Sequence, residues 1–173
     1  MYFELRKWKM DDIADVAYYA NNKKIANNLR DSFPYPYTKK NAEEFVQGCV
    51  ENDETRQMCR AIIINGRVTG SIGVFFQDDV YNRCGRLGYW LAEDYWNRGI
   101  MSQAIARICN DVFNNYNIIR IYAEPFSFNI GSRRALEKAG FVLEGIMKNG
   151  VCKDGCIFDY CMYALLREEP EIV

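Results

Sequence analysis

The sequence predicts a mixed α/β fold with a central, mostly antiparallel sheet and helices on both of its faces. Short runs rich in β-branched and aromatic residues alternate along the chain with longer stretches of helical periodicity. The dipeptide Asn65-Gly66 separates two of the strand-like runs and is typical of a tight β-hairpin. A strand, a helix and a second strand follow one another between residues 84 and 123, an order that allows one parallel crossover.

The N-terminal half of the chain is expected to supply a first strand, three helices and the hairpin. Closely spaced prolines in residues 29–37 resist helix formation, so this aromatic segment should be an irregular loop. Thr38 is a suitable N-cap for the helix that follows this loop. In order, the expected elements are a strand at 2–6, two short helices within 10–28, a helix at about 39–50, and strands at 57–64 and 68–77.

The C-terminal half is expected to alternate strands with two helices and to close with a second hairpin. Residues 99–114 carry their apolar side chains along one helical stripe, which is typical of an amphipathic helix. Gly140 suits the position just after the end of a helix. In order, the expected elements are a strand at 84–91, a helix at 99–114, a strand at 118–123, a helix at 129–139, and strands at 141–148 and 156–165.

The length and composition fit one globular domain that spans residues 1–173. A net charge of −1, from 22 basic and 23 acidic residues, provides no general attraction to nucleic acid or to an anionic membrane. The sequence contains no run near the ~20 apolar residues of a membrane span, and its first residues lack the apolar core of a secretory signal. The expected compartment is therefore the cytoplasm.

The metal-binding and nucleophilic residue types limit the chemistry that this chain can perform. Histidine is absent, which excludes a Ser-His-Asp triad, a Cys-His nucleophile and a histidine-based metal site. The 7 cysteines are scattered and are expected to be reduced thiols. Cys152 and Cys156 flank a predicted turn, where a disulfide is conceivable, but two ligands do not make a structural zinc site. No metal is expected.

The turn between residues 91 and 102 is the main candidate for a binding site. An apolar strand, Leu87–Leu91, runs into a turn that contains Arg98 and Gly99 and then into a helix. The first backbone N–H groups of a helix lack internal partners and lie at the positive end of its dipole, so such a turn binds anions. An enzyme that holds a pyrophosphate-bearing cofactor needs this arrangement, although an ordinary strand–helix connection is the alternative.

Several short segments fall in a characteristic order on the predicted elements. They are Leu87-Gly-Tyr-Trp-Leu91, Tyr95-Trp-Asn-Arg-Gly99-Ile-Met-Ser102, Asn129-Ile-Gly-Ser132, Glu137-Lys-Ala-Gly-Phe141, Glu144-Gly145 and Asp159-Tyr160. Over about residues 2–167 the chain resembles the GNAT superfamily of acyl-CoA-dependent N-acetyltransferases, and within it the RimJ/RimL-like branch. The resemblance implies the acyl-CoA N-acyltransferase fold, in which the strand at 87–91 and its parallel neighbour splay apart.

The resemblance implies acetyl-CoA as cosubstrate, with its pantetheine arm along the splayed strand and its pyrophosphate on the turn. Trp96 and Met101 depart from the residues that the wider superfamily usually has in this turn, and RimJ/RimL-like members often tolerate both changes. Backbone N–H groups make the contacts, and Gly99 has no side chain to block a close approach. The implied cofactor-binding residues are Tyr89, Leu91, Trp96, Asn97, Arg98, Gly99, Ile100, Met101, Ser102, Asn129 and Ser132.

The catalytic residues of the superfamily transfer less directly. Leu136 stands where many members have a tyrosine that protonates the departing thiolate, whereas Ser132 matches the serine to which RimL-like enzymes assign that role. Ser132 could instead be a first-turn helix residue with Asn129 as the N-cap. Glu124 ends the strand at 118–123 and could accept the amine proton through water, or it could be a solvent-exposed strand end.

The aromatic loop at 30–37 is the best candidate for acceptor binding, because in the family this region roofs the acceptor pocket. Arg30, Asp31, Phe33 and Tyr35 are the implied substrate residues, and Asp31 could pair with a cationic acceptor. Local packing of the aromatic side chains is the alternative role for this loop. The implied acceptor is a small-molecule primary amine or a peptide N-terminus, which includes protein N-termini, amino acids, polyamines and antibiotics.

Two other functions compete with that of an acetyltransferase. The first is a non-catalytic acyl-CoA-binding module with a role in sensing or recruitment. The incomplete set of acid and base residues is the reason for this alternative. A phosphate-binding enzyme of another class is disfavoured, because the chain lacks the glycine-rich loop of nucleotide kinases. The many aromatic residues lack an accompanying basic stripe, so neither nucleic acid nor membrane is an expected partner. RimL-like relatives are often dimers, which makes a homodimer one expectation.

Overall fold

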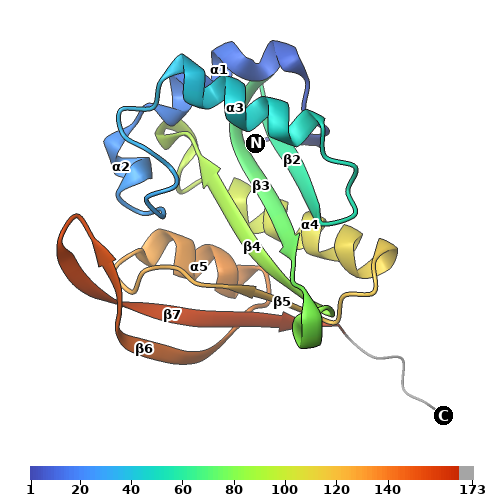
Figure 1. The fold of residues 1–173 in the computed structure, drawn as a ribbon, viewed down its shortest axis with the longest axis vertical. Coiled ribbons are helices and arrows are strands. Elements are labelled where there is room, and N and C mark those ends of the chain that lie inside the picture. Colours follow the sequence, from blue (N-terminus) through green and yellow to red (C-terminus); the bar gives the residue numbers. More distant parts are fainter. Residues whose placement is uncertain (168–173) are drawn as a thin grey trace.

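A seven-stranded mixed sheet forms the centre of the molecule (Figure 1). The structure, a computed structural model, describes residues 1–167. The strands lie in the order β1-β2-β3-β4-β5-β7-β6, and all neighbours are antiparallel except β4 and β5. The predicted fold class, a mostly antiparallel sheet with one parallel pair, is therefore confirmed.

The elements follow the predicted order along the chain. The strands are β1 (Glu4–Arg6), β2 (Gln57–Ile64), β3 (Arg67–Phe76), β4 (Cys84–Leu91), β5 (Arg120–Ala123), β6 (Val142–Lys153) and β7 (Cys156–Leu166). The helices are α1 (Ile13–Ala20), α2 (Lys23–Ala26), α3 (Lys39–Val50), α4 (Ile100–Asn115) and α5 (Ile130–Lys138), with short 3₁₀ turns at Met10–Asp12, Asp79–Tyr81 and Glu93–Tyr95.

Local sequence signals set several of these boundaries. The Asn65-Gly66 hairpin turn forms as predicted, with positive φ angles of 51° and 77°. Thr38 caps α3 by accepting the N–H of Asn41, and the Asn41 side chain returns the contact to the backbone of Thr38, as a capping box does.

The predicted end of β6 at residue 148 was wrong, because the strand continues to Lys153. The register of β6 against β7 shifts between Met147 and Val151, and Asn149 has a φ of 53°. Asp159 on β7 stabilises this irregular segment. Its carboxylate accepts hydrogen bonds from the ammonium of Lys148 at 2.8 Å and from the backbone N–H of Asn149 at 2.9 Å. A bulge therefore carries the strand through a segment whose residues are typical of a turn.

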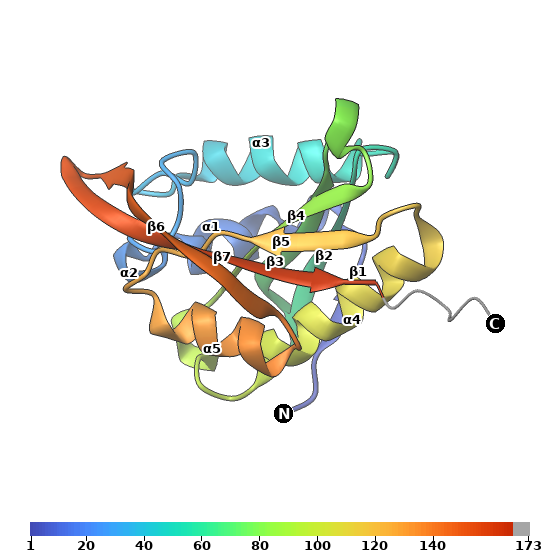
Figure 2. The ribbon, with the colours of Figure 1, turned by 90° about the horizontal axis from the view of Figure 1, so that it is seen from below.

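The helices cover the two faces of the sheet as separate layers (Figure 2). On one face, α1 and α3 bury Val16, Ala42 and Val46 against side chains of β2 and β3. On the other face, α4 and α5 bury a second cluster that includes Ile105 and Leu136. Alternate residues of a strand point to opposite faces, so Leu87 and Leu91 of β4 join the second cluster while Trp90 joins the first.

The parallel pair opens into a fork after three residues. Register between β4 and β5 is limited to Cys84–Arg86 opposite Arg120–Tyr122. On its other edge, β4 stays paired with β3 as far as Leu91. Residues 87–91 of β4 therefore have one edge that no strand of residues 1–167 covers, in the middle of the sheet. Within residues 1–167, the structure has no helix with the length and hydropathy of a membrane span.

Leu136 should anchor α5 to the sheet, because its side chain is fully buried at 0% exposure. We predict that Leu136→Ala lowers the free energy of unfolding by about 2–5 kcal/mol through lost burial and a residual cavity. Denaturant unfolding would measure the change. Arg134→Ala, on the exposed side of the same helix, should change stability by about 0.5 kcal/mol at most. Equal effects of the two substitutions would contradict this packing.

Candidate active site

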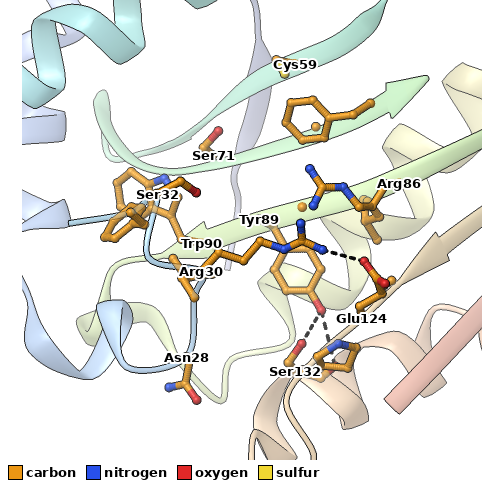
Figure 3. Close-up of a pocket in the computed structure, with 18 of the residues that line it drawn as sticks. Asn28, Arg30, Ser32, Cys59, Ser71, Arg86, Tyr89, Trp90, Glu124 and Ser132 are labelled. Carbon is orange, nitrogen blue, oxygen red and sulfur yellow. Dashed lines mark hydrogen bonds and ion pairs between the residues drawn. The ribbon is translucent and has the colours of Figure 1, made fainter. Parts of the chain in front are cut away.

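A cavity of about 540 Å³ lies where β4 and β5 separate (Figure 3). We call it the inner cavity. Its walls come from the loop at 28–33, from α3, from the strands β2 to β4, and from the segment that follows β5. Arg86 and Trp90 of β4 line it on one side, and Glu124 lines it on the other.

A second cavity, of about 620 Å³, runs along the turn between β4 and α4. We call it the turn groove, and its walls are the turn at 95–102 and the first residues of α5. The inner cavity and the turn groove share the lining residues Asn28, Leu29, Tyr89, Trp90, Asn129 and Ser132. The two cavities therefore meet at the open edge of β4, and a molecule in one can reach a molecule in the other.

The turn groove presents a row of backbone donors. Asn97 and Gly99 have φ angles of 59° and 72°, which turns successive N–H groups outward before α4 begins. Within residues 1–167, none of the N–H groups from Asn97 to Ser102 donates a hydrogen bond, whereas the carbonyl of Gly99 accepts from Ser102 Oγ and Gln103 Nε2. The side chain of Ile100 is buried in the core, so this residue offers its backbone to the groove. The geometry is that of an anion site.

Positive side chains surround this row of donors. Arg98 comes from the turn, and Arg134 and Lys138 come from the facing helix α5. Sequence reasoning missed Arg134 and Lys138, although their spacing of four residues on a helix next to the Asn129–Ser132 segment was a usable signal. Together these residues give the groove the charge that a phosphate group requires.

A half-buried hydroxyl pair marks the junction of the two cavities. The hydroxyls of Tyr89 and Ser132 lie 2.7 Å apart, and Asn129 caps α5 by accepting the N–H of Ser132 at 3.1 Å. The predicted N-cap is therefore confirmed, and it fixes the position of Ser132. Burial raises the pKa of Tyr89 despite the opposing hydrogen bond with Ser132. The phenol thus stays protonated at neutral pH and can donate a hydrogen bond.

The predicted acceptor loop contributes unequally to the inner cavity. Arg30 and Phe33 line it, and Arg30 Nη2 lies 2.7 Å from Glu124 Oε2. Asp31 and Tyr35 line neither cavity. Asp31 instead forms an ion pair, at 2.7 Å, with Lys153 at the tip of the β6–β7 hairpin. The Lys153 side chain is 11% exposed and that of Asp31 is 75% exposed, so the ion pair joins the hairpin tip to the outer surface of the loop. An ion pair thus occupies the carboxylate that the sequence suggested for a cationic acceptor.

Trp96 ties the turn to the strand. Its indole N–H donates to the carbonyl of Leu91 at 2.8 Å, and its ring packs against the buried side chains of both faces. Met101 packs against the same core as Ile100. The two residues that depart from the usual superfamily pattern therefore hold the turn in shape while they line the groove.

Among residues 1–167, no group of three or more Asp, Glu or Cys side chains is arranged to hold a metal ion. The junction of the two cavities offers the hydroxyls of Tyr89 and Ser132, and the inner cavity adds the ion-paired carboxylate of Glu124.

A family model described as an acetyltransferase (GNAT) domain matches residues 3–142. The chain belongs to the GNAT acetyltransferase family. Curated relatives include an uncharacterized N-acetyltransferase of the SPbeta prophage in Bacillus subtilis, which is 29% identical to this chain. The match covers 97% of this chain and 92% of the length of that relative. The ribosomal-protein-serine acetyltransferase of Escherichia coli is 24% identical over 72% of this chain and 75% of its own.

Solved structures share the GNAT fold of this chain. The ribosomal L7/L12 acetyltransferase RimL, in complex with coenzyme A, has a TM-score of 0.84 at 23% identity, with 95% of this chain and 93% of that chain covered. The microcin C7 self-immunity acetyltransferase, in complex with acetyl-CoA and AMP, has a TM-score of 0.83 at 18% identity, and the match covers 95% of this chain and 92% of that chain. The predicted membership in the GNAT superfamily, with RimJ/RimL-like relatives, is confirmed.

The hydrogen bond between Trp96 and Leu91 leads to a test of the turn. We predict that Trp96→Phe lowers the free energy of unfolding by about 1–3 kcal/mol, because the Leu91 carbonyl loses its donor. Trp8→Phe is the matched control, since the buried indole N–H of Trp8 has no partner among residues 1–167 and no hydrogen bond is lost. Thermal unfolding of both variants would measure the difference. Because Trp8 is the more deeply buried of the two, Trp8→Phe also reports the packing cost of the smaller ring. An unchanged free energy of unfolding in Trp96→Phe would contradict the role assigned to Trp96.

Proposed function

We propose that this GNAT protein transfers the acetyl group of acetyl-CoA to a primary amine while both molecules are bound. The observation that carries the proposal is the meeting of the turn groove and the inner cavity at Tyr89 and Ser132. One cavity would hold the cosubstrate and the other the acceptor. The chain acts in this proposal as a single N-acetyltransferase domain.

The turn groove suits acetyl-CoA on chemical grounds. Its unpartnered N–H groups from Asn97 to Ser102 would bind the pyrophosphate, and the charges of Arg98, Arg134 and Lys138 would balance the phosphates. The RimL and microcin C7 acetyltransferase structures, which contain coenzyme A and acetyl-CoA, support the same cosubstrate here. Asn129 would add a polar contact from the start of α5.

The open edge of β4 would position the reacting end of the cosubstrate. Within residues 87–91, the alternate residues that do not hydrogen-bond β3 have their backbone N–H and C=O groups on an edge that no strand of residues 1–167 covers, and of these groups the Leu91 carbonyl already accepts from Trp96. These groups would hydrogen-bond the amides of the pantetheine arm and polarise the thioester carbonyl. When bound, acetyl-CoA supplies an acetyl group that is already activated as a thioester.

The acceptor amine would enter from the inner cavity and lose one proton, which Glu124 takes through a water molecule. A nitrogen–carbon bond then forms and the carbon–sulfur bond breaks. Ser132, hydrogen-bonded to Tyr89, would donate a proton to the departing sulfur. An acceptor that enters as an ammonium ion gives up two protons in all. The first leaves through water and Glu124 to the solvent, and the second, lost by the nitrogen after the new bond forms, replaces the proton that Ser132 gave to sulfur. Most of the rate would come from holding the two reactants together, because the junction has few acid–base groups.

The acceptor class in this proposal is a small-molecule amine or a peptide N-terminus. The Escherichia coli relative is a ribosomal-protein-serine acetyltransferase, and RimL is a ribosomal L7/L12 alpha-N-protein acetyltransferase. A protein N-terminus is therefore one member of that class.

The pyrophosphate site can be tested by calorimetry. We predict that Gly99→Glu abolishes acetyl-CoA binding, because a carboxylate at this position repels the pyrophosphate and obstructs its approach. Gly66→Glu is a matched control, because Gly66 lies in a distant hairpin turn and has open space around it. The φ angle of Gly66 is 77°, similar to the 72° of Gly99. Unchanged acetyl-CoA affinity in Gly99→Glu would overturn the proposed location.

The reaction itself can be tested by thiol release from acetyl-CoA over a panel of amines and peptides. We predict that Ser132→Ala and Glu124→Gln each lower kcat by about 100-fold, while acetyl-CoA affinity in calorimetry is retained. Turnover unaffected by both substitutions would refute the catalytic roles. Tight acetyl-CoA binding without thiol release from any amine would favour the non-catalytic acyl-CoA-binding module.

A further inference from the structure

The inner cavity contains an arginine that the proposed reaction does not use. Arg86 lies on β4 at the last parallel pair with β5, opposite Tyr122, and lines the cavity. Its side chain is half-buried, and it forms no ion pair or hydrogen bond with any of residues 1–167. Its guanidinium stacks over the ring of Phe75 with a separation of 5.5 Å from the ring centroid. A cation in this position is partly removed from water without a compensating anion.

The neighbouring charges do not supply that anion. Figure 3 shows the guanidinium groups of Arg30 and Arg86 and the carboxylate of Glu124 turned toward one another. Glu124 is already paired with Arg30 at 2.7 Å, so this pair is neutral and Arg86 remains in excess. Burial lowers the pKa of Arg86 and the nearby Arg30 lowers it further, while the charge of Glu124 raises it in part, so that two guanidinium groups face one carboxylate. Glu44, at the rim, is exposed and lies 3.8 Å from Lys40.

Aromatic side chains form part of the cavity wall near Arg86. Phe33, Phe45, Phe75 and Trp90 line it, with the rings of Phe33 and Trp90 6.0 Å apart. Such walls accommodate an apolar body and exclude water, which strengthens any ion pair formed inside. The wall therefore combines apolar surface with a cation that has no ion-pair partner among residues 1–167.

We propose that the acceptor amine carries an anionic group, a carboxylate or a phosphate, on an apolar body, and that Arg86 binds this group. The proposal rests on the proposed function and specifies its acceptor. The guanidinium fork matches two oxygens of such a group. The body of the acceptor packs against Phe33 and Trp90, and its amine lies toward the junction at Tyr89 and Ser132. Polyamines and neutral amines lack the group that Arg86 requires.

The test compares amines that differ in one group. Phenylalanine, its phosphonate analogue, phenylalaninamide and spermidine are each assayed for thiol release with the full-length protein. We expect one of the two anionic amines to be used with a kcat/KM at least 10-fold above that of the amide and of spermidine, and the identity of that amine distinguishes carboxylate from phosphate. Arg86→Gln should lower kcat/KM for the anionic amine by about 30-fold or more and leave the amide nearly unchanged.

Matched variants separate binding from folding. Arg83 is an exposed arginine just before β4, and Arg83→Gln should leave unchanged the ratios of kcat/KM between the anionic amines and the neutral or cationic ones. Arg86→Lys keeps the charge without the fork and should retain part of the preference. Calorimetric acetyl-CoA affinity verifies that each variant is folded. Intrinsic differences between the amines cancel, because each substrate is compared between wild type and variant.

A second readout does not depend on turnover. We expect N-acetylphenylalanine or its phosphonate analogue to bind the coenzyme A-loaded protein, and Arg86→Gln to weaken that binding by about 30-fold or more. If acetyl-CoA binds and no amine is turned over, the proposed reaction fails while this measurement still decides the anion site. Equal use or binding of anionic and neutral compounds, or equal effects of Arg86→Gln and Arg83→Gln, would overturn the proposal.

Discussion

The early end of parallel pairing between β4 and β5 is the constraint on which the rest of this structure depends. Only Cys84–Arg86 pair with Arg120–Tyr122, and β5 ends at Ala123. Pro125 then follows Glu124; a proline has no N–H to donate and cannot continue a sheet ladder. The two strands diverge from this point, and the exposed backbone edge of β4 becomes available to bind a ligand. In a continuous sheet that edge would be occupied by hydrogen bonds.

The fork also brings the two faces of the sheet together at one place. Arg86 and Trp90 project toward the side of α3, whereas Leu87 and Leu91 project toward α4 and α5. In a sheet without such a gap, the backbone separates the side chains on one face from those on the other, and the two sets do not contact each other. Here Tyr89 lines both cavities, and its hydroxyl reaches Ser132 on α5 through the gap. A site for two reactants can therefore form without a large cleft between domains.

Much of the fold and the local geometry of the turn groove could be predicted from the sequence. The Asn65-Gly66 turn, the caps at Thr38 and Asn129, and the turn at 95–102 all depend on residues within a few positions of one another. The wall of the inner cavity could not be predicted in the same way. The contacts that form it join residues far apart in the chain: 94 positions for Arg30 with Glu124 and 122 for Lys153 with Asp31. The extension of β6 was missed for the same reason, since Asp159 supports it from another strand.

The sequence by itself determined the order of the elements, the family and the turn of free N–H groups, because local hydrogen bonding and periodicity specify these features. Only the tertiary structure decided which charges are paired. It engaged Asp31 and Glu124 in ion pairs and left Arg86 without one among the described residues. The physical reason is that pairing and burial depend on where β5, α3 and the β6–β7 hairpin pack around the fork, and no short segment of sequence contains that information.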